Sequence, residues 1–272
     1  MKLFDRTTRR VVLTNDAAQF KTSAESLLRE FDNLIGDLRA IAQSQRGHVR
    51  IAALPSMIMH ILTPALTTFR NAYPHITISV SDGGADKIER IVLDGVADFG
   101  ISSRLNNYPE LDYVPMLLDS FGAIFPHDHP LAQSSGPLRW SELAAHQYIA
   151  LTNDTGIGAF LNSHPDLGFR EKDNPHDRAS STTSLYAMLS LGGKFSVLPA
   201  LAAQAGPLKQ FKFRELYQPT ITWEICLITR RLRSQSANTR QILDALIGTI
   251  RKADNLNGAR TILDGKLKGR KK

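Results

Sequence analysis

The sequence predicts an α/β protein in which a long N-terminal helix precedes alternating strands and helices. Two observations support this fold class. Between residues 49 and 101, apolar segments of strand length alternate with helical segments in the order βαβαβ, which implies parallel strands joined by helical crossovers. Ahead of this region, apolar residues recur at alternating steps of four and three, the seam spacing of a two-stranded coiled coil.

The N-terminal helix, residues 15–46, is predicted to be the dimerisation element. Thr14 can cap its first turn through the side-chain hydroxyl, and Gly47 can end it. The seam consists of Phe20, Ala24, Leu27, Phe31, Leu34, Leu38 and Ile41. The alternative is an amphipathic helix that packs on its own domain, which is a common fate of such stripes.

The elements of the body are predicted from apolar runs bounded by turn-forming residues. Ser56 is a suitable N-cap after the first strand, and Gly95 closes the second helix. The predicted strands are residues 49–54, 75–80, 97–101, 111–118, 121–125, 148–151, 195–198 and 223–229. The predicted helices are residues 57–72, 86–94, 140–145, 158–164, 184–190 and 238–253.

The composition of the 272 residues is that of a soluble globular protein, with 42% hydrophobic and 22% charged residues. No apolar run is long enough to span a membrane, and no export signal opens the chain. A single cysteine, Cys226, excludes an internal disulfide and a multi-cysteine zinc site, and its apolar surroundings predict a buried side chain. We therefore expect a cytoplasmic protein with no cofactor, no bound metal and no membrane partner.

The net charge of +7 is concentrated at the two ends of the chain. Residues 1–50 hold 9 Lys and Arg against 6 Asp and Glu, and residues 251–272 hold 8 against 2. The body between them is close to neutral, with 16 against 18. Basic ends favour local contacts with a polyanion rather than broad nucleic-acid binding. The C-terminal tail, residues 251–272, is expected to be a solvated end.

The N-terminal segment resembles LysR-type transcriptional regulators through residues 3–14, the long helix and residues 47–53. In that family the first of these segments joins the recognition helix to the wing of a winged helix-turn-helix. The matching positions are Phe4, Arg6, Thr8, Arg10, Leu13 and Thr14. The resemblance implies DNA contacts by Arg6, Thr8, Arg9 and Arg10.

Family members carry a three-helix DNA-reading unit ahead of this point, and this chain begins almost past it. We therefore expect residues 1–14 to be a remnant of the wing, and specific DNA readout to be weak or absent, because the element that reads base edges in the major groove is lacking.

The resemblance continues through the body in a set of landmarks at the expected spacing. They are residues 51–57, 69–74, 95–101, 129–132, 191–199 and 223–231. One departure is Lys194, where the family often has a glycine that permits backbone geometry costly for lysine. Either the turn differs here or Lys194 enters the ligand cleft.

The resemblance implies the two-lobed fold of periplasmic solute-binding proteins (type 2), used as an effector-binding domain. Lobe I would comprise residues 49–118 and 222–250, and lobe II residues 119–221. The ligand cleft would lie between the lobes. That position agrees with the tendency of open α/β sheets to bind ligands at strand carboxyl ends, where helix N-termini attract anions.

The expected effector-binding residues are mostly hydroxyls and amides at strand-to-helix turns, with one guanidinium for a carboxylate. They are Ser56, Ser102, Ser103, Arg104, Thr152, Asn153, Thr155, Thr182 and Thr183, with Phe195 as an apolar wall. The alternative is structural. Ser, Thr and Asn favour such turns as caps, Arg104 is suited to a surface ion pair, and Phe195 is suited to the core.

These features predict the effector-binding and oligomerisation part of a ligand-responsive transcriptional regulator, active as a homodimer or homotetramer and sensing a small organic anion. The alternative is a free-standing small-molecule-binding protein of the same fold with no DNA-binding role. An enzyme is not expected, because the sequence lacks a nucleophile-elbow pattern and the His127-Asp128-His129 turn has too few ligands for a metal.

Overall fold

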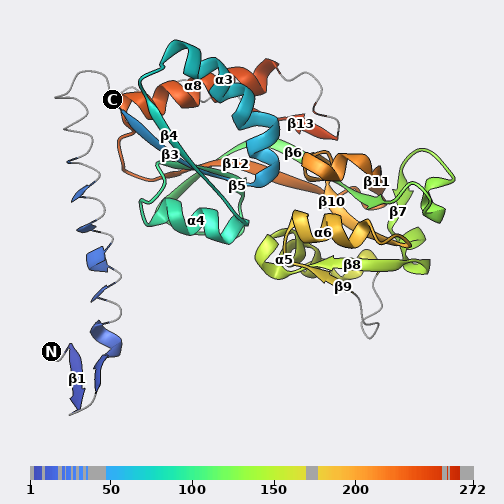
Figure 1. Cartoon of the computed structure of the whole chain (residues 1–272), viewed down its shortest axis with the longest axis horizontal. Helices are drawn as coiled ribbons and strands as arrows, with labels where there is room; N and C mark the ends of the chain where they lie inside the picture. Colours follow the sequence, from blue (N-terminus) through green and yellow to red (C-terminus); the bar gives the residue numbers. More distant parts are fainter. Residues whose placement is uncertain are drawn as a thin grey trace.

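The computed structural model describes residues 3–7, 10–17, 20, 21, 23–25, 27, 28, 31, 32, 35, 47–169, 177–252, 256 and 258–263. The body forms two lobes that share two long strands, β6 (Leu111–Phe125) and β12 (Thr222–Arg230) (Figure 1). The predicted α/β class is confirmed. None of the helices within these described ranges is long and apolar enough to cross a membrane.

The first lobe contains the predicted βαβαβ unit. Strand β3 pairs in parallel with β4 on one side and β5 on the other, and the sheet continues through β12 to β6. The elements are β3 (His48–Ala53), α2 (Pro55–Met57), the π-helical turn η1 (Ile58–Leu62), α3 (Thr63–Ala72), β4 (Thr77–Asp82), α4 (Ala85–Leu93), β5 (Phe99–Ser103) and α8 (Ala237–Lys252). Helices α3 and α8 pack against each other (Figure 1).

The second lobe is built around β10, which pairs antiparallel with β6 and parallel with β8. Its strands are β7 (Leu138–Arg139), β8 (Gln147–Leu151), β9 (Asp177–Ala179), β10 (Lys194–Pro199) and β11 (Lys212–Tyr217). Its helices are η2 (Pro130–Ala132), η3 (Trp140–Ala145), η4 (Asn153–Thr155), α5 (Ile157–Asn162), η5 (Pro165–Leu167), α6 (Thr182–Leu189), α7 (Ala200–Ala203) and η6 (Gly206–Gln210). Strand β13 (Ala259–Thr261) pairs with β6.

Strand β6 belongs to both lobes. Its first ten residues pair with β12, and its last residues, from Phe121 on, pair with β10 and β11. Two separate cores follow from this division. One contains Phe69, Phe99 and Ile225, and the other contains Phe121 and Phe195.

The β6–β12 pairing contains a bulge at Met116, next to Pro115. Pro115 pairs with Cys226 and Leu117 with Ile225, so Met116 is the extra residue on β6. Proline has no backbone N–H to donate to the ladder, so within a central strand it is tolerated where pairing is already interrupted. A bulge also increases local twist. This irregularity lies beside the end of β5, because Ser102 is the other β partner of Cys226.

Several predicted boundaries were wrong. Residues 111–118 and 121–125 form one strand rather than two, because β6 crosses between the lobes without a turn. Strand β11 was not predicted, since its sequence KFRELY has no apolar run. The helix predicted at 184–190 begins at Thr182, because Ser181 is its N-cap and accepts a hydrogen bond from the amide N–H of Ser184 (3.1 Å).

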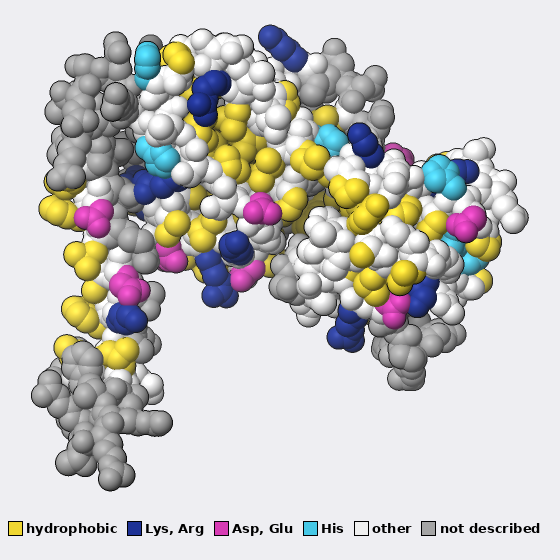
Figure 2. Space-filling view, in the orientation of Figure 1, with side chains coloured by type: hydrophobic (Ala, Val, Ile, Leu, Met, Phe, Trp, Pro, Cys, Tyr) yellow, Lys and Arg dark blue, Asp and Glu magenta, His cyan; other side chains and the backbone are white. Residues whose placement is uncertain are grey.

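The N-terminal ribbon is an antiparallel hairpin of β1 (Phe4–Thr7) and β2 (Arg10–Leu13). Thr14 caps the following helix as predicted, since its hydroxyl accepts from the amide N–H of Ala17 (3.2 Å). Phe20, Leu27 and Phe31 are 58%, 67% and 60% exposed. Figure 2 shows hydrophobic side chains along this helix. The alternative of a helix packed on its own domain is therefore wrong for these residues, while Leu34, Leu38 and Ile41 lie outside the described residues.

This exposed stripe predicts self-association through the helix. The double change Leu27→Lys and Phe31→Lys should raise the dimer dissociation constant at least about a hundredfold, because burying each large apolar side chain contributes about 1.5–3 kcal/mol. Sedimentation equilibrium would measure the change. Glu25→Lys introduces the same charge at an exposed position two residues before Leu27, nearly on the opposite side of the helix, and should leave association nearly unchanged. Equal association of all three chains would contradict a helical dimer interface.

Candidate functional site

Several of the predicted ligand residues lie at the carboxyl ends of β3, β5 and β8. Leu54, which follows β3, donates its amide N–H to the carbonyl of Ile101 in β5 (3.0 Å), so Ser56, just after β3, and Ser102, near the end of β5, belong to neighbouring strand ends. Thr152 follows β8 in the other lobe. Helix α4 of the first lobe contacts the η4 turn that comes after Thr152.

Gly156 makes this contact between the lobes close. A Cβ atom at this position would lie 3.4 Å from the Cβ of Ala85 and 3.6 Å from the ring of Trp223. The φ angle of Gly156 is +75°, which disfavours any other residue. The turn after β8 therefore approaches the start of α4 with backbone rather than side chain.

Three hydroxyl groups at these strand ends are buried without a partner. Within the described parts of the chain, no donor or acceptor reaches the Oγ of Ser102, the Oγ of Ser103 or the Oγ1 of Thr152. Buried polar groups are nearly always hydrogen-bonded, and each exception costs about 1–3 kcal/mol. Ser102 and Ser103 are successive residues of β5 and point to opposite faces of the sheet, while Thr152 follows β8 in the second lobe.

Other predicted residues have local hydrogen bonds that fit a capping role. The Thr155 hydroxyl donates to the Thr152 carbonyl (2.7 Å) and accepts from the Gly158 amide (3.1 Å). The side-chain amide of Asn162 donates to Asn153 Oδ1 (2.7 Å). Thr182 and Thr183 lie inside the first turn of α6, rather than before it, because Ser181 is the cap.

Phe195 and Lys194 adopt structural positions. Phe195 is fully buried in the second core, with the Tyr148 ring 5.4 Å away, which corresponds to the core alternative for this residue. The turn before β10 is made by Gly192 and Gly193, with φ angles of +83° and +71°. Lys194 begins β10 and forms an ion pair with Asp177. The Lys194 ammonium is thus bound to Asp177, beside a turn formed by two glycines.

Arg104 is the exposed cation next to the unpartnered serines. Its guanidinium lies over the Tyr113 ring, 4.9 Å from the ring centroid, and it donates to Asn107 Oδ1. No ion pair holds it among the described residues, so the alternative of a surface salt bridge is not observed there. Cys226 is buried as predicted, and burial together with the nearby Glu224 carboxylate raises the pKa of its thiol to about 12.

Asp119 is a buried carboxyl where β6 crosses between the lobes, and the sequence reasoning missed it. It is 1% exposed and accepts from the Leu201 amide at the start of α7 (3.2 Å). Burial raises its pKa to about 7, and these backbone hydrogen bonds only partly oppose the shift. His60, on the π-helical turn, bonds through Nε2 to the Leu201 carbonyl (3.0 Å), and burial lowers its pKa.

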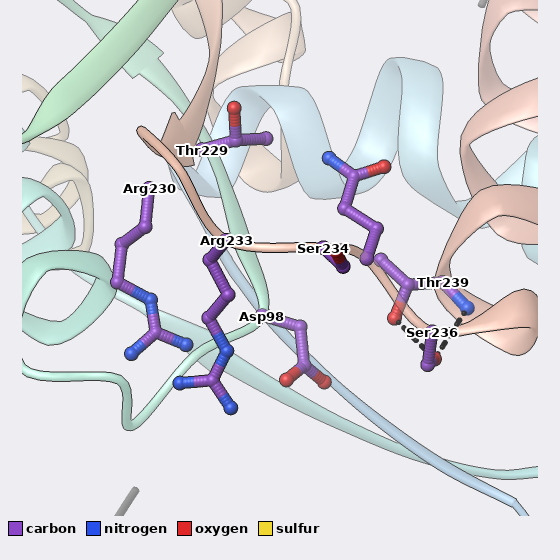
Figure 3. Close-up of a pocket in the computed structure, with 8 residues that line it drawn as sticks. Asp98, Thr229, Arg230, Arg233, Ser234, Ser236 and Thr239 are labelled. Atoms are coloured by element: carbon purple, nitrogen blue, oxygen red, sulfur yellow. Dashed lines mark hydrogen bonds between the residues drawn. The ribbon is translucent and has the colours of Figure 1, made fainter. Parts of the chain in front are cut away.

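A hollow lies in the first lobe where β12 meets α8, away from these strand ends. Figure 3 shows Arg230 and Arg233 beside Asp98, with Ser236 and Thr239 at the start of α8. Asp98 is already paired with Arg50 (3.1 Å), and Ser236 caps the helix by accepting from the Thr239 amide (3.1 Å). These contacts describe a surface ion-pair region that includes none of the predicted ligand residues.

Comparison with known proteins decides the family. The LysR substrate binding domain matches residues 42–251, most of the chain. The chain belongs to this LysR family. It is 26% identical over 231 residues to the uncharacterized HTH-type transcriptional regulator YbhD of Escherichia coli K12, covering 85% of this chain and 72% of YbhD. It is 29% identical to the regulator CrgA of Neisseria meningitidis serogroup C, covering 71% of this chain but only 62% of CrgA.

Solved structures show that the two-lobed fold is that of LysR effector-binding domains. The effector-binding domain of QuiR, in complex with shikimate, aligns with a TM-score of 0.66 at 17% identity, covering 76% of this chain and 99% of that chain. A reduced form of OxyR from N. meningitidis aligns with a TM-score of 0.62 at 18% identity, covering 80% of this chain and all of the OxyR chain. The predicted periplasmic-binding-protein-like fold of this LysR-family chain is confirmed.

Asp119 predicts a specific pH dependence of stability. The pKa is raised on folding from 3.8 to about 7, so the folded state binds the proton more tightly. The resulting stabilisation is complete below pH 4 and is lost as the pH rises to about 7. Asp119→Asn should remove this pH dependence of the free energy of unfolding, which spans at most about 4 kcal/mol between the two pKa values. Urea unfolding between pH 4.5 and 8.5 would measure it, with the exposed Asp166→Asn as control. Identical slopes for Asp119→Asn and the wild type would contradict the assignment.

Proposed function

We propose that this chain is the effector-binding and oligomerisation part of a LysR-type transcriptional regulator and that it senses a small organic anion between the lobes. The supporting observation is that strand ends in both lobes carry buried hydroxyls without hydrogen-bond partners: Ser102 and Ser103, which face opposite sides of the first sheet, and Thr152 after β8. A ligand whose oxygens accept from Thr152 and from the serine on its side of the sheet would remove a cost that the ligand-free protein bears. The fold is also that of QuiR, which was solved in complex with shikimate.

The proposed ligand carries a carboxylate because Arg104 follows the two serines directly. A guanidinium can bind a carboxylate through two parallel N–H donors, while serine and threonine hydroxyls donate single bonds. Ser56 contributes from the start of α2 in the first lobe, and Thr152 contributes from the second lobe. The ligand thereby touches both lobes, as a sensor of their relative position requires. Asn153, Thr155, Thr182, Thr183 and Phe195 stay in the proposed set as neighbours of these contacts.

Ligand binding would act on the arrangement of the lobes or subunits. A ligand shifts such an equilibrium only if it binds one arrangement more tightly than the other. A route for this exists at α7, which packs against α2 and receives the contacts of Asp119 and His60. A movement of α2 on ligand binding would therefore be transmitted through α7 to Asp119, where β6 passes from one lobe to the other.

Assembly into a homodimer or homotetramer would use the exposed apolar stripe of the N-terminal helix. A free-standing binding protein of the same fold would have no use for such a stripe, so the exposed Phe20, Leu27 and Phe31 favour the regulator. The relatives are transcriptional regulators, and we propose no catalytic role.

We also propose that Arg6, Thr8, Arg9 and Arg10 contact the phosphate backbone of DNA. The strands of the hairpin that carries them pair in the register Thr7 to Arg10. Thr8, Arg9 and the side chains of Arg6 and Arg10 lie outside the described residues, so the proposal rests on the basic sequence of the ribbon and the family.

The ligand site predicts a selective response to small carboxylic acids. Shikimate, benzoate, citrate and succinate form a suitable panel for thermal-shift and calorimetric titration. At least one should stabilise the chain, and Ser56→Ala or Thr152→Val should weaken its binding about tenfold, the value of one hydrogen bond of about 1.4 kcal/mol. Ser102→Ala should weaken binding without lowering the melting temperature of the ligand-free chain, since it removes an unpaired buried group.

The matched control for these variants is Ser190→Ala. Its hydroxyl is exposed on α6 and donates to the Tyr186 carbonyl (2.8 Å). It should leave ligand affinity unchanged. No stabilisation of the wild type by any acid of the panel would count against the sensing role, and a large loss of ligand-free stability in Ser102→Ala would show that this hydroxyl is structurally satisfied.

The phosphate contacts predict salt-dependent DNA binding that is insensitive to sequence. The slope of log K against log salt should decrease in magnitude by about 0.9 for each of Arg6, Arg9 and Arg10 replaced by Ala. Gel shifts with an unrelated duplex would measure it, and Arg70→Ala, at an exposed position on α3 in the near-neutral body, would serve as control. Tight, sequence-specific binding by this chain would contradict a backbone-only contact.

A further inference from the structure

We propose that Glu89 is a positioning residue that holds Arg104 at the ligand site. The inference rests on the proposed function, since it assigns a role to Arg104 there. Glu89 lies on α4 and is 0% exposed, a rare environment for a carboxylate. The buried residues of this helix are Ala85, Ile88, Glu89 and Val92, so Glu89 occupies a position that an apolar residue would fill in an ordinary amphipathic helix.

The Glu89 carboxylate is satisfied almost entirely by the turn that follows β5. The backbone amides of Leu105 and Asn106 donate to Oε1 (2.9 and 3.2 Å), and the Asn106 amide also reaches Oε2 (3.1 Å). The Asn106 side chain donates to Oε2 (2.8 Å). Glu89 therefore binds the two residues immediately after Arg104, as an anion is bound by successive backbone N–H groups.

Tyr113 joins Glu89 to Arg104 from the other side. Its hydroxyl donates to Glu89 Oε1 (3.1 Å), and its ring carries the Arg104 guanidinium at 4.9 Å. The Arg104 side chain closes the turn by donating to Asn107 Oδ1. The two residues that follow Arg104 and the ring beneath its guanidinium thus contact the same carboxylate.

The arrangement separates two opposite charges that would otherwise pair. Glu89 takes hydrogen bonds from amides and a phenol, and no Glu89–Arg104 ion pair occurs in the described structure. A direct pair would neutralise the guanidinium and reduce its attraction for a carboxylate. In the observed arrangement, the Tyr113 ring and the turn after β5 restrain Arg104, and the remaining guanidinium N–H groups can donate to a ligand. Removal of the Glu89 charge should loosen the turn and lower the affinity for anions.

The test compares Glu89→Gln with Arg104→Ala and with the double variant. Amide hydrogen exchange of residues 104–107 in the ligand-free chain should accelerate at least about tenfold in Glu89→Gln, because a carboxylate hydrogen bond is replaced by a weaker one. Affinity for the best carboxylate of the panel should fall about tenfold, with no change for its neutral amide. In the Arg104→Ala background, the second change should have almost no further effect on affinity.

Two further variants keep the test decisive. Asn106→Ala removes one donor to Glu89 and should reproduce part of the effect even if Glu89→Gln folds poorly, while Glu110→Gln, an exposed carboxyl, should change neither measurement. Unchanged exchange, or an equal loss of affinity with and without Arg104, would overturn the positioning role. If the wild type binds no carboxylate, the proposed function fails, and the exchange result alone decides whether Glu89 holds the turn.

Discussion

The antiparallel pairing of β6 with β12 is the constraint on which both lobes depend. Strand β6 continues beyond this ladder into the second lobe, where its last residues pair with β10 and β11, so the ladder anchors the strand that both lobes use. The ladder is interrupted at Met116, opposite the step from Ile225 to Cys226. Because Cys226 also pairs with Ser102, this bulge increases the twist of the sheet next to Ser102 and Ser103.

The buried polar groups fall into two classes, those with hydrogen-bond partners and those without. Glu89 and Asp119 are satisfied by backbone amides, Glu89 at the turn after β5 and Asp119 at the start of α7. Ser102, Ser103 and Thr152 are left without partners. The first group stabilises the turn after β5 and the start of α7, and the second lowers the stability of the protein on its own.

Local features of the site were predictable, and long-range ones were not. The Thr14 cap, the buried Cys226 and the hydroxyls at strand ends follow from neighbouring residues and from spacing. Thr155 shows the limit of such reasoning, since the same pattern describes a helix cap and a ligand contact. Glu89 gave one weak signal, a charged residue on the apolar face of α4, but its partners lie 16 to 24 residues away.

The sequence by itself determined the α/β class, the order of the main elements and the heptad stripe, because each depends on periodicity within a short segment. It also carried the likeness to LysR regulators. Only the tertiary structure decided that β6 is one continuous strand, that Lys194 pairs with Asp177, and which hydroxyls lack partners. These outcomes depend on contacts between segments distant in the chain, where burial and hydrogen-bond geometry are set by packing that no local pattern encodes.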